Sequence, residues 1–125
     1  MRKYLIDDPI YGAEIILLVG TPQDYKSTLR RTFKDVPKRA FAIDDAMGAT
    51  EAFLKKSGTQ ANIVWLNGWK DDVEHLGILV HESVHCMNFI FLYADVFYSM
   101  EKDEVAAYYL DWIFTQCLKR LRKGK

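Results

Sequence analysis

The sequence predicts a single α+β domain over residues 1–125, in which a small, mainly antiparallel sheet packs against two helices. Two observations predict this class. Short β-branched and aliphatic runs bounded by turn residues occur through the first half of the chain, and the segment from Ile78 to Lys123 contains neither glycine nor proline. Half of the residues are hydrophobic and the formal net charge is zero, which is typical of an ordinary globular protein.

The first elements are a buried strand and a capped helix. Ala13 to Val19 is β-branched and aliphatic, which indicates a strand. Thr21 and Asp24 then form a capping-box pattern around Pro22, so we expect a helix from there to about Lys34. We interpret the basic residues of this helix as a solvated face, because no aromatic residues alternate with them as in a nucleic-acid surface.

Further strands are expected before the middle of the chain. Arg39 to Asp44 is predicted to be a strand, and Met47 to Leu54 another, either regular or with a bulge at Gly48. A turn is expected over residues 55–60. Ala61 to Leu66 is the clearest strand after the first, and these pieces would form one small sheet.

The carboxyl third is predicted to be helical with one interruption. Asp71 or Asp72 is expected to cap a central helix. The interruption is placed within Ala94 to Met100, where Ser99 would cap a last helix from Glu101 to about Arg122.

Charged residues argue against a secreted or membrane-spanning chain. Two aspartates and a proline interrupt the amino terminus where a signal peptide needs an apolar core. The most apolar segment, Ile78 to Tyr98, contains a glutamate, two histidines and an aspartate, which disfavours a membrane span. Cys86 and Cys117 lie on two different predicted helices and suit a reducing compartment. We therefore expect a cytoplasmic protein without a membrane partner.

The central helix carries the motif that predicts chemistry, His81-Glu82-Ser83-Val84-His85. Residues four apart share one helix face, so the imidazoles of His81 and His85 point the same way and Glu82 lies beside them. Imidazole nitrogens on consecutive turns fit adjacent corners of a tetrahedral zinc site. Glu82 would accept a proton from a water in the open coordination position. The sequence thus predicts one Zn²⁺ ion held by two histidines, with a glutamate as general base.

A catalytic zinc needs a third protein ligand. The only other histidine, His75, lies about 120° from the paired face and is interpreted as a surface or capping residue, and Cys86 as a core thiol. A downstream carboxylate is therefore expected. Glu104 is preferred over Glu101 and Asp103, because those acids precede the apolar part of the last helix. The alternative role for Glu104 is an exposed glutamate favoured by the helix dipole.

The motif, followed nineteen residues later by Glu104, resembles the zinc metallopeptidases called gluzincins, in which two histidines and a glutamate hold the ion. The resemblance covers about Ile63 to Phe114, and is nearest to small phage and prophage metallopeptidases. It implies a minimal zincin-like fold and hydrolysis of a peptide bond in a peptide or protein substrate. It also implies that Ile63 to Leu66 forms the sheet edge along which the substrate aligns.

The sequence departs from the gluzincin pattern at two positions. Tyr108 replaces an acid that often orients a zinc histidine, so Asp111, Asp44 or Asp45 is expected in that role. No later histidine is available to stabilise an oxyanion, which makes Tyr108 or Tyr109 the candidate, with Tyr108 assigned as catalytic. The alternative is that either tyrosine is simply an amphipathic core residue.

Two other functions compete with peptide hydrolysis. In the first, the chain is a zinc-stabilised binding protein, such as a phage factor that engages a host protein without cutting it, and zinc serves folding. In the second, the chain binds nucleic acid through its basic helix and tail. Zero net charge disfavours that second function, and no nucleic-acid partner is expected.

Overall fold

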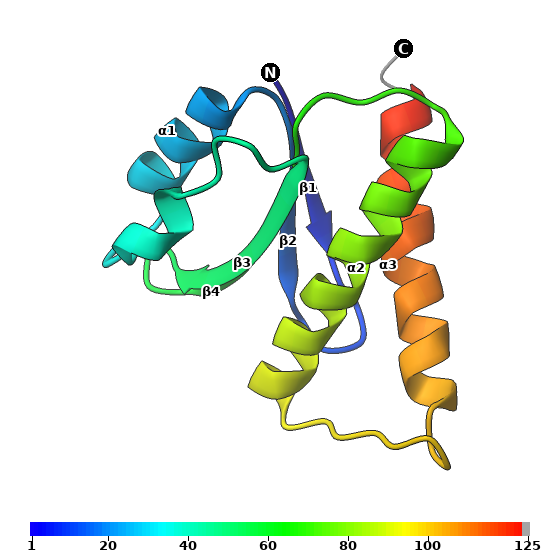
Figure 1. The fold of residues 1–125 in the computed structure, drawn as a ribbon. Coiled ribbons are helices and arrows are strands. Elements are labelled where there is room, and N and C mark those ends of the chain that lie inside the picture. Colours follow the sequence, from blue (N-terminus) through cyan, green and yellow to red (C-terminus); the bar gives the residue numbers. More distant parts are fainter. Residues whose placement is uncertain (124–125) are drawn as a thin grey trace.

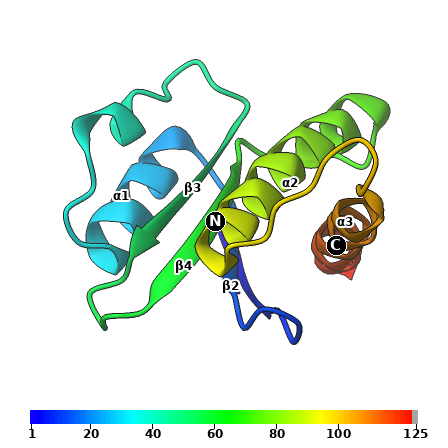
Figure 2. The same ribbon diagram turned by 90° about the horizontal axis from the view of Figure 1, so that it is seen from below.

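The computed structural model describes residues 1–123 and confirms the α+β class (Figure 1). One sheet separates two layers of helices, with α1 on one face and α2 and α3 on the other (Figure 2). The elements in chain order are β1 (Arg2–Asp7), β2 (Glu14–Val19), α1 (Pro22–Thr32), the 3₁₀ turn η1 (Lys38–Phe41), β3 (Gly48–Leu54), β4 (Gln60–Leu66), α2 (Val73–Ala94) and α3 (Glu104–Lys123).

The four strands lie in the order β1-β2-β4-β3. The β1/β2 and β3/β4 pairs are antiparallel and the β2/β4 pair is parallel, so the sheet is mainly antiparallel, as predicted. β1 and β3 are the edge strands, and β4 lies between β2 and β3. The expectation that Ile63 to Leu66 forms the sheet edge is therefore wrong, because the parallel pairing with β2 places this segment inside the sheet.

The side chains of β4 point alternately to the two faces of the sheet and contribute to a separate core on each face. Val64 and Leu66 belong to the core beneath α2 and α3. Ile63 and Trp65 belong to the core beneath α1, where Tyr25 stacks on Trp65 with ring centroids 4.9 Å apart. Both faces of β4 are therefore shielded from water, which explains its nearly continuous apolar sequence.

The predicted capping box of α1 is confirmed. The Thr21 hydroxyl accepts a hydrogen bond from the Asp24 backbone N–H at 3.1 Å, and the Asp24 carboxylate accepts one from the Thr21 N–H at 2.9 Å. The strand expected over residues 39–44 is wrong, since this stretch forms the η1 turn. β3 is regular, with unbroken pairing to β4, so no bulge forms at Gly48.

Asp72 caps α2 as expected, because its carboxylate accepts the backbone N–H of His75 at 2.9 Å. The interruption runs from 95 to 103, so the last helix begins at Glu104 and Ser99 is not its cap. By length and composition alone α2 could cross a membrane, a test that core helices of soluble proteins also pass. Here α2 packs between the sheet and α3.

A buried carboxylate joins the first hairpin to the last helix. Asp8, in the β1–β2 connection, is 3% exposed and accepts the backbone N–H groups of Ile10 and Tyr11 at 2.8 and 2.9 Å. The Tyr109 hydroxyl of α3 donates to the same carboxylate at 2.7 Å. Three donors therefore replace the water that this carboxylate loses on burial.

Candidate metal centre

Two histidines on consecutive turns of α2 form the centre of the candidate site. The Nε2 atoms of His81 and His85 lie 3.3 Å apart, on the exposed face of the helix. Two nitrogens bound at about 2.0–2.1 Å on adjacent corners of a tetrahedron are separated by about 3.3–3.4 Å. The pair thus has the spacing that one zinc ion requires, and the donor set suits zinc.

Glu82 lies beside the pair and is buried. Its side chain is 7% exposed, and its Oε2 lies 4.0 Å from the His81 Nε2. Its Oε1 accepts a hydrogen bond from the Thr50 hydroxyl at 2.8 Å. One carboxylate oxygen is therefore held by the sheet, and the other lies near the histidine nitrogens.

The edge strand β3 supplies this support, which the sequence did not reveal. Thr50 is 32 positions from Glu82, and its hydroxyl also lies 3.2 Å from the Glu82 carbonyl. Gly48 permits the close approach, because a Cβ there would lie 2.9 Å from the Trp65 carbonyl oxygen and 3.2 Å from Glu82 Cγ. A glycine inside a strand was the one signal that could have indicated this contact.

An open cleft of about 460 Å³ adjoins the base. Met47 and Gly48 from the start of β3 line one side, and His81 and Glu82 from α2 line the other. Glu74 also lines it, seven residues before His81 and therefore on the same helix face. His81 and Glu82 consequently border a space that a substrate could enter.

The structure does not bring the predicted three-ligand set together. Among residues 1–123 no third histidine, cysteine, aspartate or glutamate completes a metal-binding group. Tyr109 stacks on Phe91 with centroids 5.3 Å apart, which aligns these levels of the antiparallel helices α2 and α3. Glu104 lies five residues before Tyr109 and His85 lies six residues before Phe91, and because the helices are antiparallel these offsets lead in opposite directions. At about 1.5 Å per residue, Glu104 and His85 therefore lie about 16 Å apart along the helix axes. Glu104 is exposed at the start of α3, the alternative role considered for it.

The residues proposed to assist the histidines are either exposed or bonded to other residues. Tyr108 is 70% exposed on α3, whereas Tyr109 is a core residue whose hydroxyl donates to Asp8. Asp111 accepts a hydrogen bond from Thr115, and Asp44 pairs with Lys26 at 2.6 Å. Asp45, the third acid considered, is exposed in the segment before β3. In the described part of the chain none of these acids bonds to the paired imidazoles.

Two predictions about nearby residues are confirmed. His75 is a capping residue, with its Nδ1 2.7 Å from the Asp72 carboxylate. The backbone hydrogen bond from His75 is the main cause that lowers the pKa of Asp72. Cys86 is a fully buried core thiol, and burial raises its pKa well above the ordinary value.

The chain matches no protein-family model, no curated protein and no solved structure.

Proposed function

We propose that the chain is a zinc-dependent peptidase in which His81 and His85 hold the ion and Glu82 is the general base. The observation that carries this proposal is the 3.3 Å spacing of the two Nε2 atoms beside a buried, tethered carboxylate. A structural zinc site is closed by four protein ligands. An exposed pair instead supports an open, catalytic arrangement.

Glu82 is suited to move a proton. The Thr50 hydroxyl fixes Oε1, so Oε2 is the atom that accepts a proton from the attacking water and later donates it to the leaving amine. Zinc, when bound, would lower the pKa of that water and polarise the scissile carbonyl. Burial of the carboxylate within the α2–β3 contact keeps Oε2 in one position, which supports efficient transfer.

The proposed zinc site still needs a third protein ligand. We keep Glu104 as its candidate from the sequence pattern; because it lies about 16 Å from His85 along the helix axes, joint binding of one ion would require α3 to rearrange against α2. The 95–103 connection has no regular structure apart from turns, and it is tied to α2 by the Tyr98 hydrogen bond to Asn88 at 3.1 Å, by the Val96 N–H bond to the Phe91 carbonyl at 2.8 Å and by the contact of the Tyr98 and Phe91 rings. In a zinc titration, Glu104→Gln should weaken binding while Glu101→Gln, its matched neighbour, should not. Equal affinity in both variants would contradict this assignment.

The substrate is proposed to be an extended peptide or protein segment. Within residues 1–123, β4 is the only strand paired with β3, and the segment after α1 bonds the outer edge of β3 only at its Leu54 end, so the rest of that edge offers backbone groups to an added strand. Gly48 and Thr50 place the start of this edge against Glu82. A peptide on β3 would therefore pass the base.

The deciding experiment compares wild type with Glu82→Gln on a peptide library. The variant should bind zinc with unchanged stoichiometry and lose about 10²–10⁴-fold in kcat. Glu14→Gln, which removes a charge at the far end of the sheet, should leave both measurements unchanged. Turnover retained by Glu82→Gln would refute the assignment. Zinc binding and zinc-dependent stability without cleavage by wild type would instead indicate the non-catalytic binding protein.

A further inference from the structure

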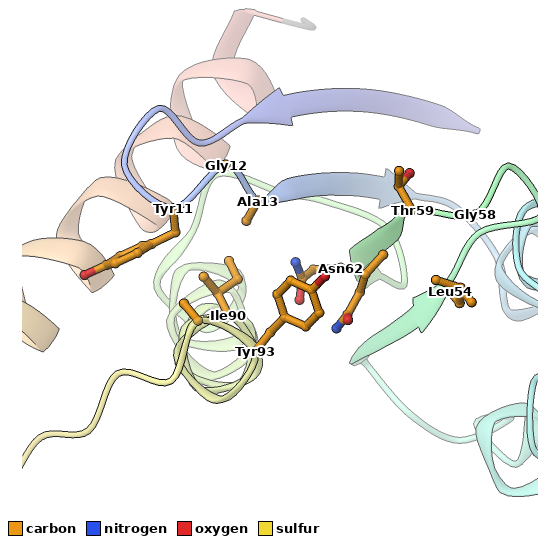
Figure 3. A pocket seen from close by; sticks show the side chains of 11 residues that line it. Tyr11, Gly12, Ala13, Leu54, Gly58, Thr59, Asn62, Ile90 and Tyr93 are labelled. Carbon is orange, nitrogen blue, oxygen red and sulfur yellow. The ribbon is translucent and has the colours of Figure 1, made fainter.

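A second cleft lies near the last turns of α2, and part of its wall is polar (Figure 3). It measures about 300 Å³, at the lower end of the range of about 300–1,000 Å³ that is common for small-molecule pockets. Its walls come from the segment before β2, the turn between β3 and β4, and the end of α2. The residues that matter here are Tyr11, Ala13, Leu54, Asn62, Ile90 and Tyr93.

Asn62 is the unusual member of this wall. It lies on β4 at the position of the same face that Val64 and Leu66 occupy with apolar side chains, and it is 4% exposed. Its Nδ2 donates to the Glu14 carbonyl at 3.2 Å, which fixes the orientation of the amide. Its Oδ1 is buried and has no hydrogen-bond partner among residues 1–123. An unpaired buried acceptor is costly, so a polar group here suggests a ligand that satisfies it.

We propose that this cleft binds a small neutral ligand that carries an N–H donor, of the amide or amine type, on a flat apolar body. The donor would pair with Asn62 Oδ1, and the body would lie among Leu54, Ile90 and the Tyr93 ring. No charged side chain lines the cleft. Lys55 and Glu14, which adjoin the lining residues Leu54 and Ala13 in the sequence, pair with each other at 2.6 Å, so neither is free to act as the counter-ion of a charged ligand.

The cleft is separate from the histidine pair. Tyr93 follows His85 by eight residues, which is about 12 Å along α2. None of its lining residues belongs to the cleft beside Glu82. The proposal therefore stands whether or not the chain hydrolyses peptides.

Benzamide is a suitable probe, because it is neutral, flat and carries a primary amide. In an ¹H–¹⁵N NMR titration of the full chain, we expect saturable shifts at Leu54, Asn62 and Tyr93, with a Kd on the order of 1 mM. Toluene, which lacks the donor, should bind at least about fivefold more weakly. Shifts absent from these residues, or equal affinity for toluene and benzamide, would overturn the proposal.

Variants test the same contact. Asn62→Leu should weaken benzamide binding about five- to tenfold, while Asn88→Leu, the same change on the exposed side of α2, should not. If Asn62→Leu fails to fold, Ala13→Phe decides, because it fills the cleft and leaves Asn62 in place. Undiminished benzamide binding by a folded Asn62→Leu or by Ala13→Phe would contradict the assignment.

Discussion

Thr50 holds the candidate base, Glu82, in position through its one hydroxyl hydrogen. That hydrogen serves two acceptors of Glu82, the carboxylate Oε1 at 2.8 Å and the backbone carbonyl at 3.2 Å. The contact is buried, so water cannot replace it. Thr50 is a positioning residue, since it acts on the site only through Glu82.

Thr50→Val tests this role. Loss of the hydroxyl leaves a buried carboxylate oxygen without its donor, and we expect the free energy of unfolding to fall by about 1–3 kcal/mol. For the proposed peptidase reaction, kcat should fall with little change in KM, because the base loses its position and the substrate surface is unchanged. Urea denaturation and steady-state kinetics measure the two effects. Thr50→Ser should recover both, and a fully stable and active Thr50→Val would contradict the argument.

At the residue scale, the sequence correctly predicted those arrangements that depend only on the spacing of residues along one helix. The shared face of His81 and His85 follows from four-residue spacing, and the position of Glu82 beside them follows from the same geometry. The support from Thr50 comes from a different element and leaves no local signal. Glu104 was placed by a pattern within α3, but its distance from the pair depends on how two helices align.

Elements with local signals were predicted well and those without them were not. α1 carries its own capping box, so its start was located correctly. β1 was missed, because it is an edge strand with only Ile6 buried. Residues 39–44 have a strand-like composition, yet no strand partner is available there and the chain forms a 3₁₀ turn. Whether a neighbouring strand is available for pairing depends on the tertiary structure, and local composition does not reveal it.

β3 and α2 pack closely because Gly48 has no side chain. Gly48→Ala would place a methyl group 2.9 Å from the Trp65 carbonyl oxygen and against Glu82, so strand and helix must separate. We expect a loss of about 1–3 kcal/mol in the free energy of unfolding. Gly77→Ala is the matched control, because its Cβ meets no atom within 4 Å and alanine favours the helix. Urea denaturation should show opposite signs, and equal effects would contradict the close-approach argument.

At the scale of the whole molecule, the fold class was predictable and the strand order was not. Buried runs and a helical carboxyl third are local patterns that add up to an α+β domain. The order β1-β2-β4-β3 requires the parallel pairing of β2 with β4 across α1 and β3, which no short segment encodes. The edge of the sheet was therefore assigned to the wrong strand.

Two buried thiols should make the stability of the whole domain depend on alkaline pH. Burial raises the pKa of Cys117 from 9.0 to about 12, and raises that of Cys86 well above 9.0. Above pH 9 the unfolded chain releases thiol protons that the folded chain retains, so stability decreases as pH rises. The slope should approach about 1.4 kcal/mol per pH unit for each thiol.

Urea denaturation of wild type and of Cys117→Ala between pH 8 and about pH 9.5 measures this slope, and the contribution of the buried tyrosines, which begin to ionise in the unfolded chain as the pH nears 10, is common to both proteins. Cys117→Ala should reduce the slope by the share of one thiol. A stability that is constant or rising across this interval would show that the thiols are not protected from solvent in the folded state.

The bond between Asp8 and Tyr109 joins positions 101 residues apart. On the ribosome, the first hairpin emerges long before the helix that donates to its carboxylate. Until Tyr109 has been synthesised and has left the ribosome, the Asp8 carboxylate lacks one of its three donors, and the hairpin lacks its contact with α3. Closure of this domain therefore waits for the synthesis of α3, and a chain that stopped before Tyr109 would leave the core on this face of the sheet incomplete.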